Sequence, residues 1–213
     1  MKIKHWLAGM ALAGWAMAAP ALELAGIEVP ELQKVRGEIL LRNGAGIRTA
    51  MGFNVYVGVL YLLAGKHDAD AIIGSPTPKR MLLVLRRDLK SRVLLTAFRD
   101  GMQLNADDAT RDRLKPRIAQ FERVFDRIRD TKTGDQLALD VGGDGSVDVV
   151  FNGKVEEMIP GPDIGPAVLK IWLGQNPVSD DLKNALLAAT AKPSSSVVRQ
   201  SSAFDSVFEG YSP

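Results

Sequence analysis

One apolar run, residues 53–64, constrains the fold of this chain more than any other feature. The run carries no charge, is rich in Val, Tyr and Leu, and follows the glycine-rich segment Gly44-Ala45-Gly46. We expect it to form a central strand with both faces covered, because on the surface it would expose its apolar side chains to water. Arg48 precedes this strand. It must therefore be solvated at the rim of the sheet or paired inside a cavity, since an unpaired buried charge is very costly.

Apolar patterns along the rest of the chain predict further strands and several helices. The expected strands cover residues 22–29, 37–42, 45–50, 79–85, 136–141, 147–151 and 154–159. The expected helices cover residues 67–73, 90–102, 107–129, 162–173 and 179–189. Turn signals at Asn43-Gly44 and Asn152-Gly153 separate neighbouring strands. Pro116 is expected to kink the third helix or to mark the start of its long part.

The order of these elements predicts the fold class. Strands come first and last, whereas the helices are grouped in the middle and at the end. Segregated elements of this kind indicate an α+β domain in which helices pack on one face of an antiparallel sheet. With 213 residues and 46% hydrophobic content, one domain can bury a substantial core. We expect this domain at residues 22–189, followed by a Ser-rich disordered tail at residues 190–213.

The N-terminus has the features of a secretory signal peptide. Lys2 and Lys4 precede a short apolar run, and Ala16-Met17-Ala18 has the small-x-small pattern of a signal-peptidase site. We therefore predict a signal peptide at residues 1–18 and a periplasmic location. The alternative, an uncleaved N-terminal anchor, fits the run less well because a membrane span needs roughly 20 apolar residues.

Charge and cysteine content exclude several classes of protein. Without Lys2 and Lys4, the mature chain carries 25 basic and 25 acidic residues, so its overall charge gives no case for a nucleic-acid partner or an anionic membrane. The chain has no cysteine, which excludes a disulfide framework, a thiol nucleophile and a lipoprotein-type acylation site. We therefore expect no stable membrane anchor after the signal peptide is cleaved.

Common catalytic, metal and cofactor motifs are missing or incomplete. His67 is the only histidine after the predicted signal peptide, and its position beside a helix start favours an exposed residue over a catalytic triad member. Asp140, Asp144 and Asp148 lack the order of a calcium loop, so no metal site is expected. Gly44-Ala45-Gly46 lacks the third glycine and following helix of a dinucleotide fingerprint. No cofactor is therefore predicted.

Arg48 remains the main candidate for a functional residue. It could form a structural salt bridge or be exposed at a strand end. It could also act as an anion hook, because a guanidinium at the mouth of an apolar cavity can bind a carboxylate or an enolate bidentately. Tyr56 and Tyr61 lie on the neighbouring apolar run, where they could donate hydrogen bonds to a ligand or simply pack.

Several motifs, in their shared order, resemble the chalcone isomerase family. They are the GAGIR segment ending at Arg48, the apolar strand ending in VLYL, the Gly134-Asp135 strand start, the Asn152-Gly153 hairpin and the segment at residues 167–187. The resemblance covers roughly residues 22–189 and is closest to the exported bacterial chalcone isomerase-like proteins. It implies the open-faced sandwich of that family, with helices on one face of the sheet.

The resemblance carries over only part of the enzymes' site. Arg48 matches the arginine that holds the flavonoid phenolate in the plant enzymes, and Tyr56 lies where those enzymes use a threonine. Residues 86–95 match the stretch that supplies a tyrosine and an asparagine, but they contain neither residue type. The threonine of the late helix has no clear match at residues 163–166. The full catalytic set is therefore not present.

Three functional hypotheses follow. In the first, the protein is non-catalytic and binds a small apolar anion such as a fatty acid, with Arg48 as the carboxylate hook and Tyr56 and Tyr61 beside it. In the second, it is an isomerase of the intramolecular lyase type that acts on a chalcone-like or other enone, with Arg48 stabilising the enolate and Tyr56 as donor. In the third, the cavity is collapsed and the helical face binds a partner protein.

Overall fold

The computed structural model describes residues 22–188, and the predicted signal peptide at 1–18 and tail at 190–213 lie outside these residues. The main sheet has seven strands in the order β11-β10-β9-β6-β5-β4-β3, and every neighbouring pair is antiparallel. Two short two-stranded sheets, β1-β2 and β7-β8, accompany it. The strands are β1 (Leu22–Leu24), β2 (Ile27–Val29), β3 (Leu32–Val35), β4 (Glu38–Ala50), β5 (Phe53–Leu62), β6 (Lys79–Leu85), β7 (Leu89–Lys90), β8 (Asp130–Thr131), β9 (Gln136–Val141), β10 (Val147–Phe151) and β11 (Lys154–Ile159).

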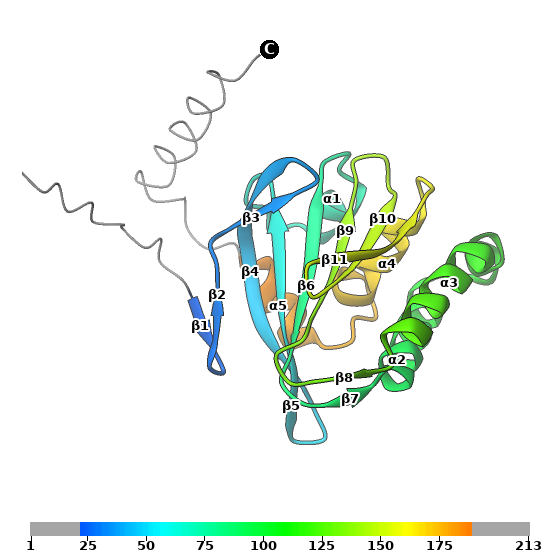
Figure 1. Cartoon of the computed structure of the whole chain (residues 1–213). Coiled ribbons are helices and arrows are strands. Elements are labelled where there is room, and N and C mark those ends of the chain that lie inside the picture. The colour runs from blue at the N-terminus through cyan, green and yellow to red at the C-terminus, as the bar shows by residue number, and fades with distance from the viewer. Residues whose placement is uncertain (1–21, 189–213) are drawn as a thin grey trace, which may run out of the picture.

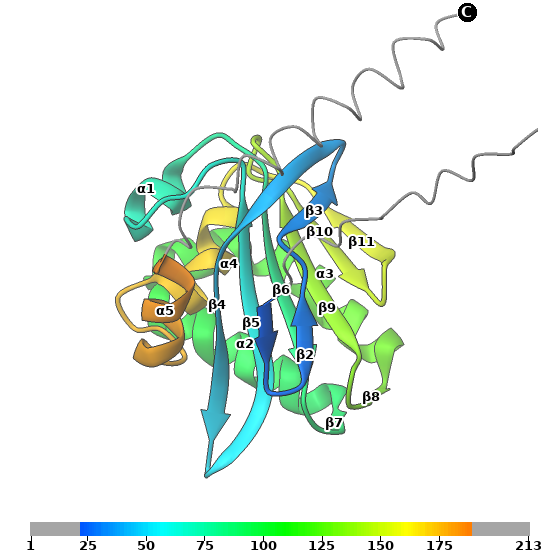
Figure 2. The same cartoon turned by 90° about the vertical axis from the view of Figure 1, so that its left-hand side faces the viewer.

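The helices lie on one side of the main sheet, as Figures 1 and 2 show. They are α1 (Ala69–Gly74), α2 (Ser91–Asn105), α3 (Asp108–Ile128), α4 (Ile164–Leu173) and α5 (Asp180–Leu187). This arrangement confirms the predicted α+β class. Asp68, Asp107 and Ser179 cap the starts of α1, α3 and α5 by accepting hydrogen bonds from backbone N–H groups. None of the described helices is long and apolar enough to cross a membrane.

Most predicted elements are present, but two local predictions are wrong, and one of the two alternatives given for Pro116 is excluded. Residues 22–29 form a hairpin rather than one strand, because Ala25 and Gly26 both adopt positive φ angles and reverse the chain. The Asn43-Gly44 signal does not make a turn, since β4 continues through it. Helix α3 continues through Pro116, which therefore does not mark a helix start.

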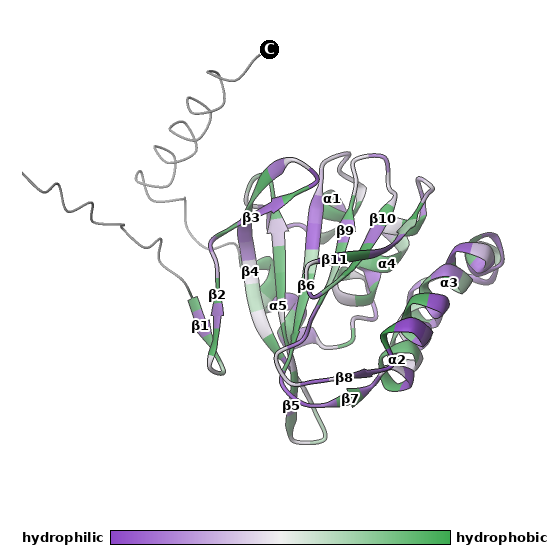
Figure 3. Ribbon diagram, in the orientation of Figure 1, coloured by the Kyte–Doolittle hydropathy of each residue, from purple (hydrophilic) through white to green (hydrophobic). Residues whose placement is uncertain are grey.

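Strand β5 divides the interior into two hydrophobic cores. Tyr56, Leu60 and Leu62 point to the helices, whereas Val57, Val59 and Tyr61 belong to a second cluster on the other face. The β1-β2 hairpin covers part of that second face, where Leu22, Leu24, Ala25 and Ile27 pack. Figure 3 shows the resulting pattern, with apolar strands in the sheet and alternating polar and apolar segments along α3. The expectation that both faces of this strand are covered is confirmed for residues 56–62, all of which are buried.

The glycines before Arg48 permit close contact between α5 and the sheet. A side chain on Gly44 would lie 2.2 Å from the carbonyl oxygen of Ala185, and one on Gly46 would lie 2.7 Å from the Ala185 Cβ. Across the strand pair, Gly58 faces Gly46 and also contacts α5, through Leu182. A stripe of three glycines thus lets the helix pack directly on the strand backbones.

Asn43 holds the same contact together from a buried position. Its amide nitrogen donates to the carbonyl oxygens of Lys66 (2.9 Å) and Leu186 (2.8 Å), and its amide oxygen accepts from the Lys66 N–H (2.8 Å). The β4–β5 pairing shifts register next to it, between Arg42 and Gly44. Asn43 therefore links β4, the loop after β5 and the end of α5, because its amide meets the polar backbone groups that this contact buries.

We predict that Gly44→Ala destabilises the protein by about 3 kcal/mol, because the new methyl group meets backbone atoms of α5 that cannot move independently. Gly74→Ala is the matched control, since a side chain at Gly74 meets nothing within 4 Å. The control should change the free energy of unfolding by less than about 0.5 kcal/mol. Urea unfolding measures both, and equal effects would contradict the close contact.

Lys79 is a buried lysine at the start of β6. Its side chain is only 1% exposed, and its amine donates to the carbonyl oxygens of Ser75 (2.6 Å) and Thr77 (2.8 Å). Burial, and to a smaller extent the nearby charge of Lys66, lowers the pKa of Lys79 to about 8. The amine therefore fixes the loop after α1 through these hydrogen bonds. Its burial makes the protonated form less favourable than it is in water.

This lowered pKa predicts a stability that rises with pH. The unfolded chain keeps the Lys79 proton up to its ordinary pKa of 10.5, whereas the folded chain loses it near pH 8. The free energy of unfolding should therefore rise by about 2 kcal/mol between pH 8 and pH 10. Lys79→Met should lack this rise when both proteins are unfolded by denaturant across the same pH range. A parallel rise in both proteins would contradict the assignment.

Candidate functional site

An apolar cavity with polar groups in its wall lies between the helices and the sheet. Its volume is about 60 Å³. Its lining comes from the sheet (Tyr56, Leu83, Leu137, Leu139), from α2 (Leu94, Ala97, Phe98), from α3 (Phe121, Phe125), and from α4 and the segment after it (Ile171, Trp172, Val178). The phenolic hydroxyl of Tyr56 and the indole N–H of Trp172 are the side-chain polar groups among these residues.

Tyr56 presents a buried hydroxyl to this cavity. Its side chain is 8% exposed, and its oxygen accepts a hydrogen bond of 3.0 Å from the Trp172 indole N–H. Burial raises the pKa of Tyr56 to about 12, although the Trp172 hydrogen bond and the Arg48 charge both act to lower it. Within residues 22–188, no acceptor for the Tyr56 proton is found. The hydroxyl therefore stays protonated at neutral pH and can donate to a ligand.

Arg48 lies directly across the β4–β5 pair from Tyr56. Directly paired residues of antiparallel strands point to the same face, so Arg48 and Tyr56 share the helix side of the sheet. The Arg48 side chain is half-buried and donates to the Thr49 carbonyl oxygen. Among the described residues it forms no ion pair with a carboxylate. Arg48 is not part of the cavity wall and lies beside it, next to Tyr56.

The structure does not bring Tyr61 to this site. Tyr61 lies in the second core, on the opposite face of the sheet, and its hydroxyl donates to the Pro30 carbonyl oxygen (3.0 Å). Burial raises its pKa to about 12, as for Tyr56. Tyr61 therefore fixes the segment between β2 and β3, and its placement gives no support to a role beside Arg48.

The sequence did not identify several residues of the cavity wall as part of a site. The sequence places Trp172 only within an expected helix at residues 162–173, yet it supplies the hydrogen bond to Tyr56. Phe98 forms an aromatic cluster with Phe121 and Phe125, at ring-centroid distances of 4.7 and 6.2 Å. Their positions within the expected helices at residues 90–102 and 107–129 do not show which wall of the cavity they form.

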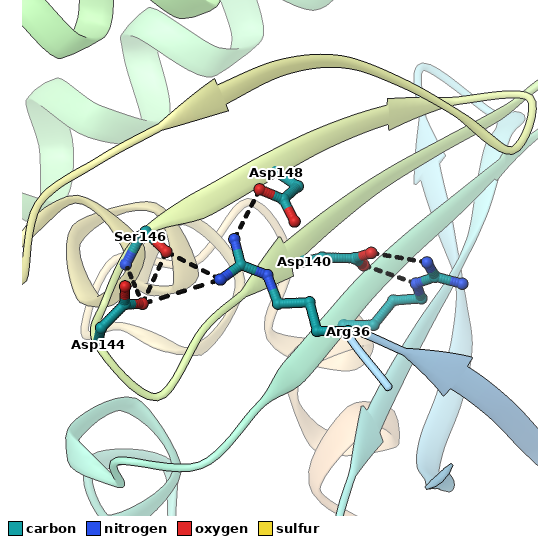
Figure 4. Close-up of polar contacts among 6 residues, drawn as sticks. Arg36, Asp140, Asp144, Ser146 and Asp148 are labelled. Atoms are coloured by element: carbon teal, nitrogen blue, oxygen red, sulfur yellow. Dashed lines mark hydrogen bonds and ion pairs between the residues drawn. The ribbon is translucent and has the colours of Figure 1, made fainter. Parts of the chain in front are cut away.

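The acidic residues of the β9–β10 hairpin pair with arginines. Asp140 and Asp148 lie directly opposite each other on β9 and β10, where two carboxylates would repel. Arg80 binds Asp140 through two hydrogen bonds of 2.6 and 2.7 Å. Arg36 binds Asp148 at 2.7 Å, as Figure 4 shows. In the part of the chain that the structure describes, no group of three or more acidic or histidine residues could hold a metal ion.

The neighbouring Asp144 completes this network. It accepts hydrogen bonds from the backbone and hydroxyl of Ser146, which hold the pKa of Asp144 below its ordinary value. Arg36 also donates to the Ser146 hydroxyl (2.9 Å), and a side chain on Gly142 would require the Arg36 guanidinium to move. The ion pairs of Arg36 thus join the turn between β3 and β4 to the loop between β9 and β10 and to β10.

His67 is exposed, and its Nδ1 lies 3.0 Å from the carbonyl oxygen of Leu187. It does not contribute to the cavity wall. This placement agrees with the interpretation of His67 as an exposed residue at a helix start.

Comparison with known proteins agrees with this architecture. The model of the family described as chalcone isomerase-like matches residues 21–188. The chain belongs to the chalcone isomerase-like family. The family resemblance noted from the sequence motifs is thereby confirmed.

Among solved structures, the fold is similar to that of a fatty-acid binding protein from Arabidopsis thaliana. The TM-score is 0.59 and the sequence identity 13%, and the match covers 79% of this chain and 95% of the plant chain. At this identity the likeness shows the chalcone isomerase-like fold alone. No curated protein matches the sequence.

We predict that Tyr56 and Trp172 are energetically coupled. Tyr56→Phe and Trp172→Phe each break the 3.0 Å hydrogen bond, so a double-mutant cycle should give a coupling of about 1 kcal/mol in the free energy of unfolding. The control cycle pairs Trp172→Phe with Tyr61→Phe, which lies on the other face, and should give less than about 0.5 kcal/mol. A coupling of the same size in both cycles would contradict the assignment.

Proposed function

We propose that this protein is a non-catalytic binding protein for a small apolar carboxylate such as a fatty acid. Under this proposal the carboxylate binds at Arg48 and Tyr56, and the acyl chain extends between the sheet and the α2–α3 helix pair. The observation that supports it most is the unused hydrogen-bonding capacity of the site. A protonated phenol without an acceptor lies beside a guanidinium without a carboxylate partner, at the edge of an apolar interior.

The electrostatics of the pair suit an anion. A guanidinium can bind both oxygens of a carboxylate, and hydrogen bonds to charged groups are stronger than those between neutral groups. The raised pKa of Tyr56, about 12, keeps its hydroxyl as a donor at any physiological pH. The Trp172 N–H donates to the Tyr56 oxygen, which polarises the hydroxyl toward a ligand on its other side.

An acyl chain needs more room than the present cavity. The cavity holds about 60 Å³, whereas ligand pockets in proteins usually measure about 300–1,000 Å³. The wall formed by α2 and α3 is the natural place to widen it, because its contacts across the cavity are apolar side chains such as Phe98, Phe121 and Phe125. Among the described residues no ion pair lies inside the cavity, so this movement works against ion pairs at the surface, which join α3 to Asp163 and Glu157. We therefore propose that ligand entry displaces the α2–α3 pair.

The composition of the cavity favours binding over catalysis. Proton transfer during catalysis usually needs groups with pKa values near the working pH. The cavity wall offers the Tyr56 hydroxyl, with a pKa of about 12, and the Trp172 indole, which only donates hydrogen bonds. These two groups therefore suit the binding of an anion by hydrogen-bond donors better than they suit proton transfer. An enone could use the same donors, which makes it a competitor to include in the test.

A solved structure of similar fold and the N-terminal sequence of this chain also support the proposal. A protein of this fold from Arabidopsis thaliana is described as fatty-acid binding. The N-terminal features of a signal peptide, at residues 1–18, favour a periplasmic site of action. We therefore propose that the exported protein carries or stores its ligand in the periplasm.

Displacement of a fluorescent fatty acid tests the proposal. Arg48→Gln should weaken binding by about 10- to 100-fold, because a charge-assisted contact is worth about 1.5–3 kcal/mol. Tyr61→Phe is the control and should bind as the wild type does, since Tyr61 lies on the other face. A chalcone added as competitor distinguishes an enone ligand from a carboxylate. The proposal is wrong if the wild type binds no fatty acid, or if Arg48→Gln binds as tightly as the wild type.

A further inference from the structure

The turn between β4 and β5 exposes two large apolar side chains at one end of the molecule. Met51 is 95% exposed and Phe53 is 59% exposed. Figures 1 and 2 both show that this hairpin extends beyond the end of the rest of the sheet. We call Met51 and Phe53, together with the neighbouring Arg86 and Arg87, the hairpin tip.

Met51 also occupies an unfavourable backbone conformation. Its φ angle is +51°, and the next residue, Gly52, has φ of +78°. Two-residue turns of this kind favour Asn or Gly at the first position, because other side chains crowd the backbone there. A long apolar side chain at this position is therefore costly both in backbone strain and in exposure to water. Neither cost is offset by contacts within the described chain, because Met51 is almost fully exposed.

Two arginines flank the exposed phenylalanine. The Arg87 guanidinium lies 4.8 Å from the centre of the Phe53 ring, and the backbone N–H of Arg86 donates to the Val55 carbonyl oxygen (2.9 Å). Together with Asn54, these residues line an open hollow of about 350 Å³. The Arg86 Nε atom is buried beneath the protein surface and has no hydrogen-bond partner in the described chain.

The positive charge of the tip is not neutralised locally. Neither Arg86 nor Arg87 forms an ion pair with a carboxylate of residues 22–188. The adjacent acidic residue, Asp88, already binds the Lys132 amine at 3.0 Å and the Thr133 N–H at 2.9 Å. The predicted mature chain has equal numbers of basic and acidic residues, yet this end of the molecule carries a local excess of positive charge beside exposed apolar side chains.

We propose that the hairpin tip docks on an anionic phospholipid bilayer. Met51 and Phe53 enter the headgroup region, where their apolar surface leaves water, and Arg86 and Arg87 bind lipid phosphate. At the surface of such a bilayer, apolar side chains enter the boundary between headgroups and acyl chains, and basic side chains bind the anionic headgroups. A protein end that carries both kinds of side chain therefore suits this surface. The hollow beside Phe53 has room for a phosphate group, and the exposed Arg87 guanidinium in its wall supplies donors for that group. This contact is peripheral and does not depend on the proposed fatty-acid site.

Sedimentation of the full chain with vesicles tests the docking. We expect binding to vesicles of phosphatidylglycerol and phosphatidylcholine, weaker binding to phosphatidylcholine alone, and a loss of binding as salt is raised from 50 to 500 mM. Arg87→Glu should weaken binding at least about fivefold, and Met51→Ser combined with Phe53→Ser should weaken it similarly. Because every variant carries the same terminal segments, differences between variants report on the tip.

Matched controls change equally exposed residues elsewhere. Met158→Ser alters a methionine that is 70% exposed on β11, and Arg123→Glu reverses an exposed charge on α3. Both controls should bind vesicles as the wild type does, and thermal unfolding should show that all variants are folded. The proposal is overturned if the wild type ignores anionic vesicles, if the controls lose as much binding as the tip variants, or if the tip mediates only self-association. It is also overturned if inorganic phosphate at millimolar concentration abolishes vesicle binding while the Met51 and Phe53 substitutions leave it unchanged.

Discussion

The double burial of β5 is the constraint on which the rest of this structure depends. A strand whose successive side chains are all apolar must have a covering layer on each face, because its two-residue period sends neighbours in opposite directions. The helices cover one face, and the β1-β2 hairpin covers part of the other. Each core then has its own tyrosine. Tyr61 ties down the segment between β2 and β3, and Tyr56 remains the one polar group of the sheet in the helix-side cavity.

Helix α5 packs closely on β4 and β5. Gly44, Gly46 and Gly58 remove the side chains that would hold the helix away, and Asn43 satisfies the backbone groups that the contact buries. Arg48 follows this close contact on β4 and faces Tyr56 across the strand pair. We propose that the apolar contacts of α2 and α3, rather than the close contact of α5, yield to a ligand.

Much of the architecture could be predicted from the sequence, because the strands β6, β9, β10 and β11 and the helix caps have strong local signals. The turn predicted at Asn43-Gly44 is wrong because Gly44 serves the close approach of α5, and contact with a helix distant in sequence leaves no local signal. The separation of Tyr56 from Tyr61 could have been predicted. The two residues are five positions apart in one strand, and an odd separation places them on opposite faces. Trp172 could not have been paired with Tyr56, since nothing in the sequence sets the rotation of α4 over the sheet.

A crystal structure of the protein with a bound long-chain fatty acid tests the central claim most directly. The account predicts that the carboxylate lies within hydrogen-bond distance of both the Arg48 guanidinium and the Tyr56 hydroxyl. It also predicts that the chain occupies an enlarged cavity between the sheet and α2–α3, with the Trp172–Tyr56 hydrogen bond retained. A fatty acid bound elsewhere, or a cavity still closed over Tyr56 at saturating ligand, would contradict it.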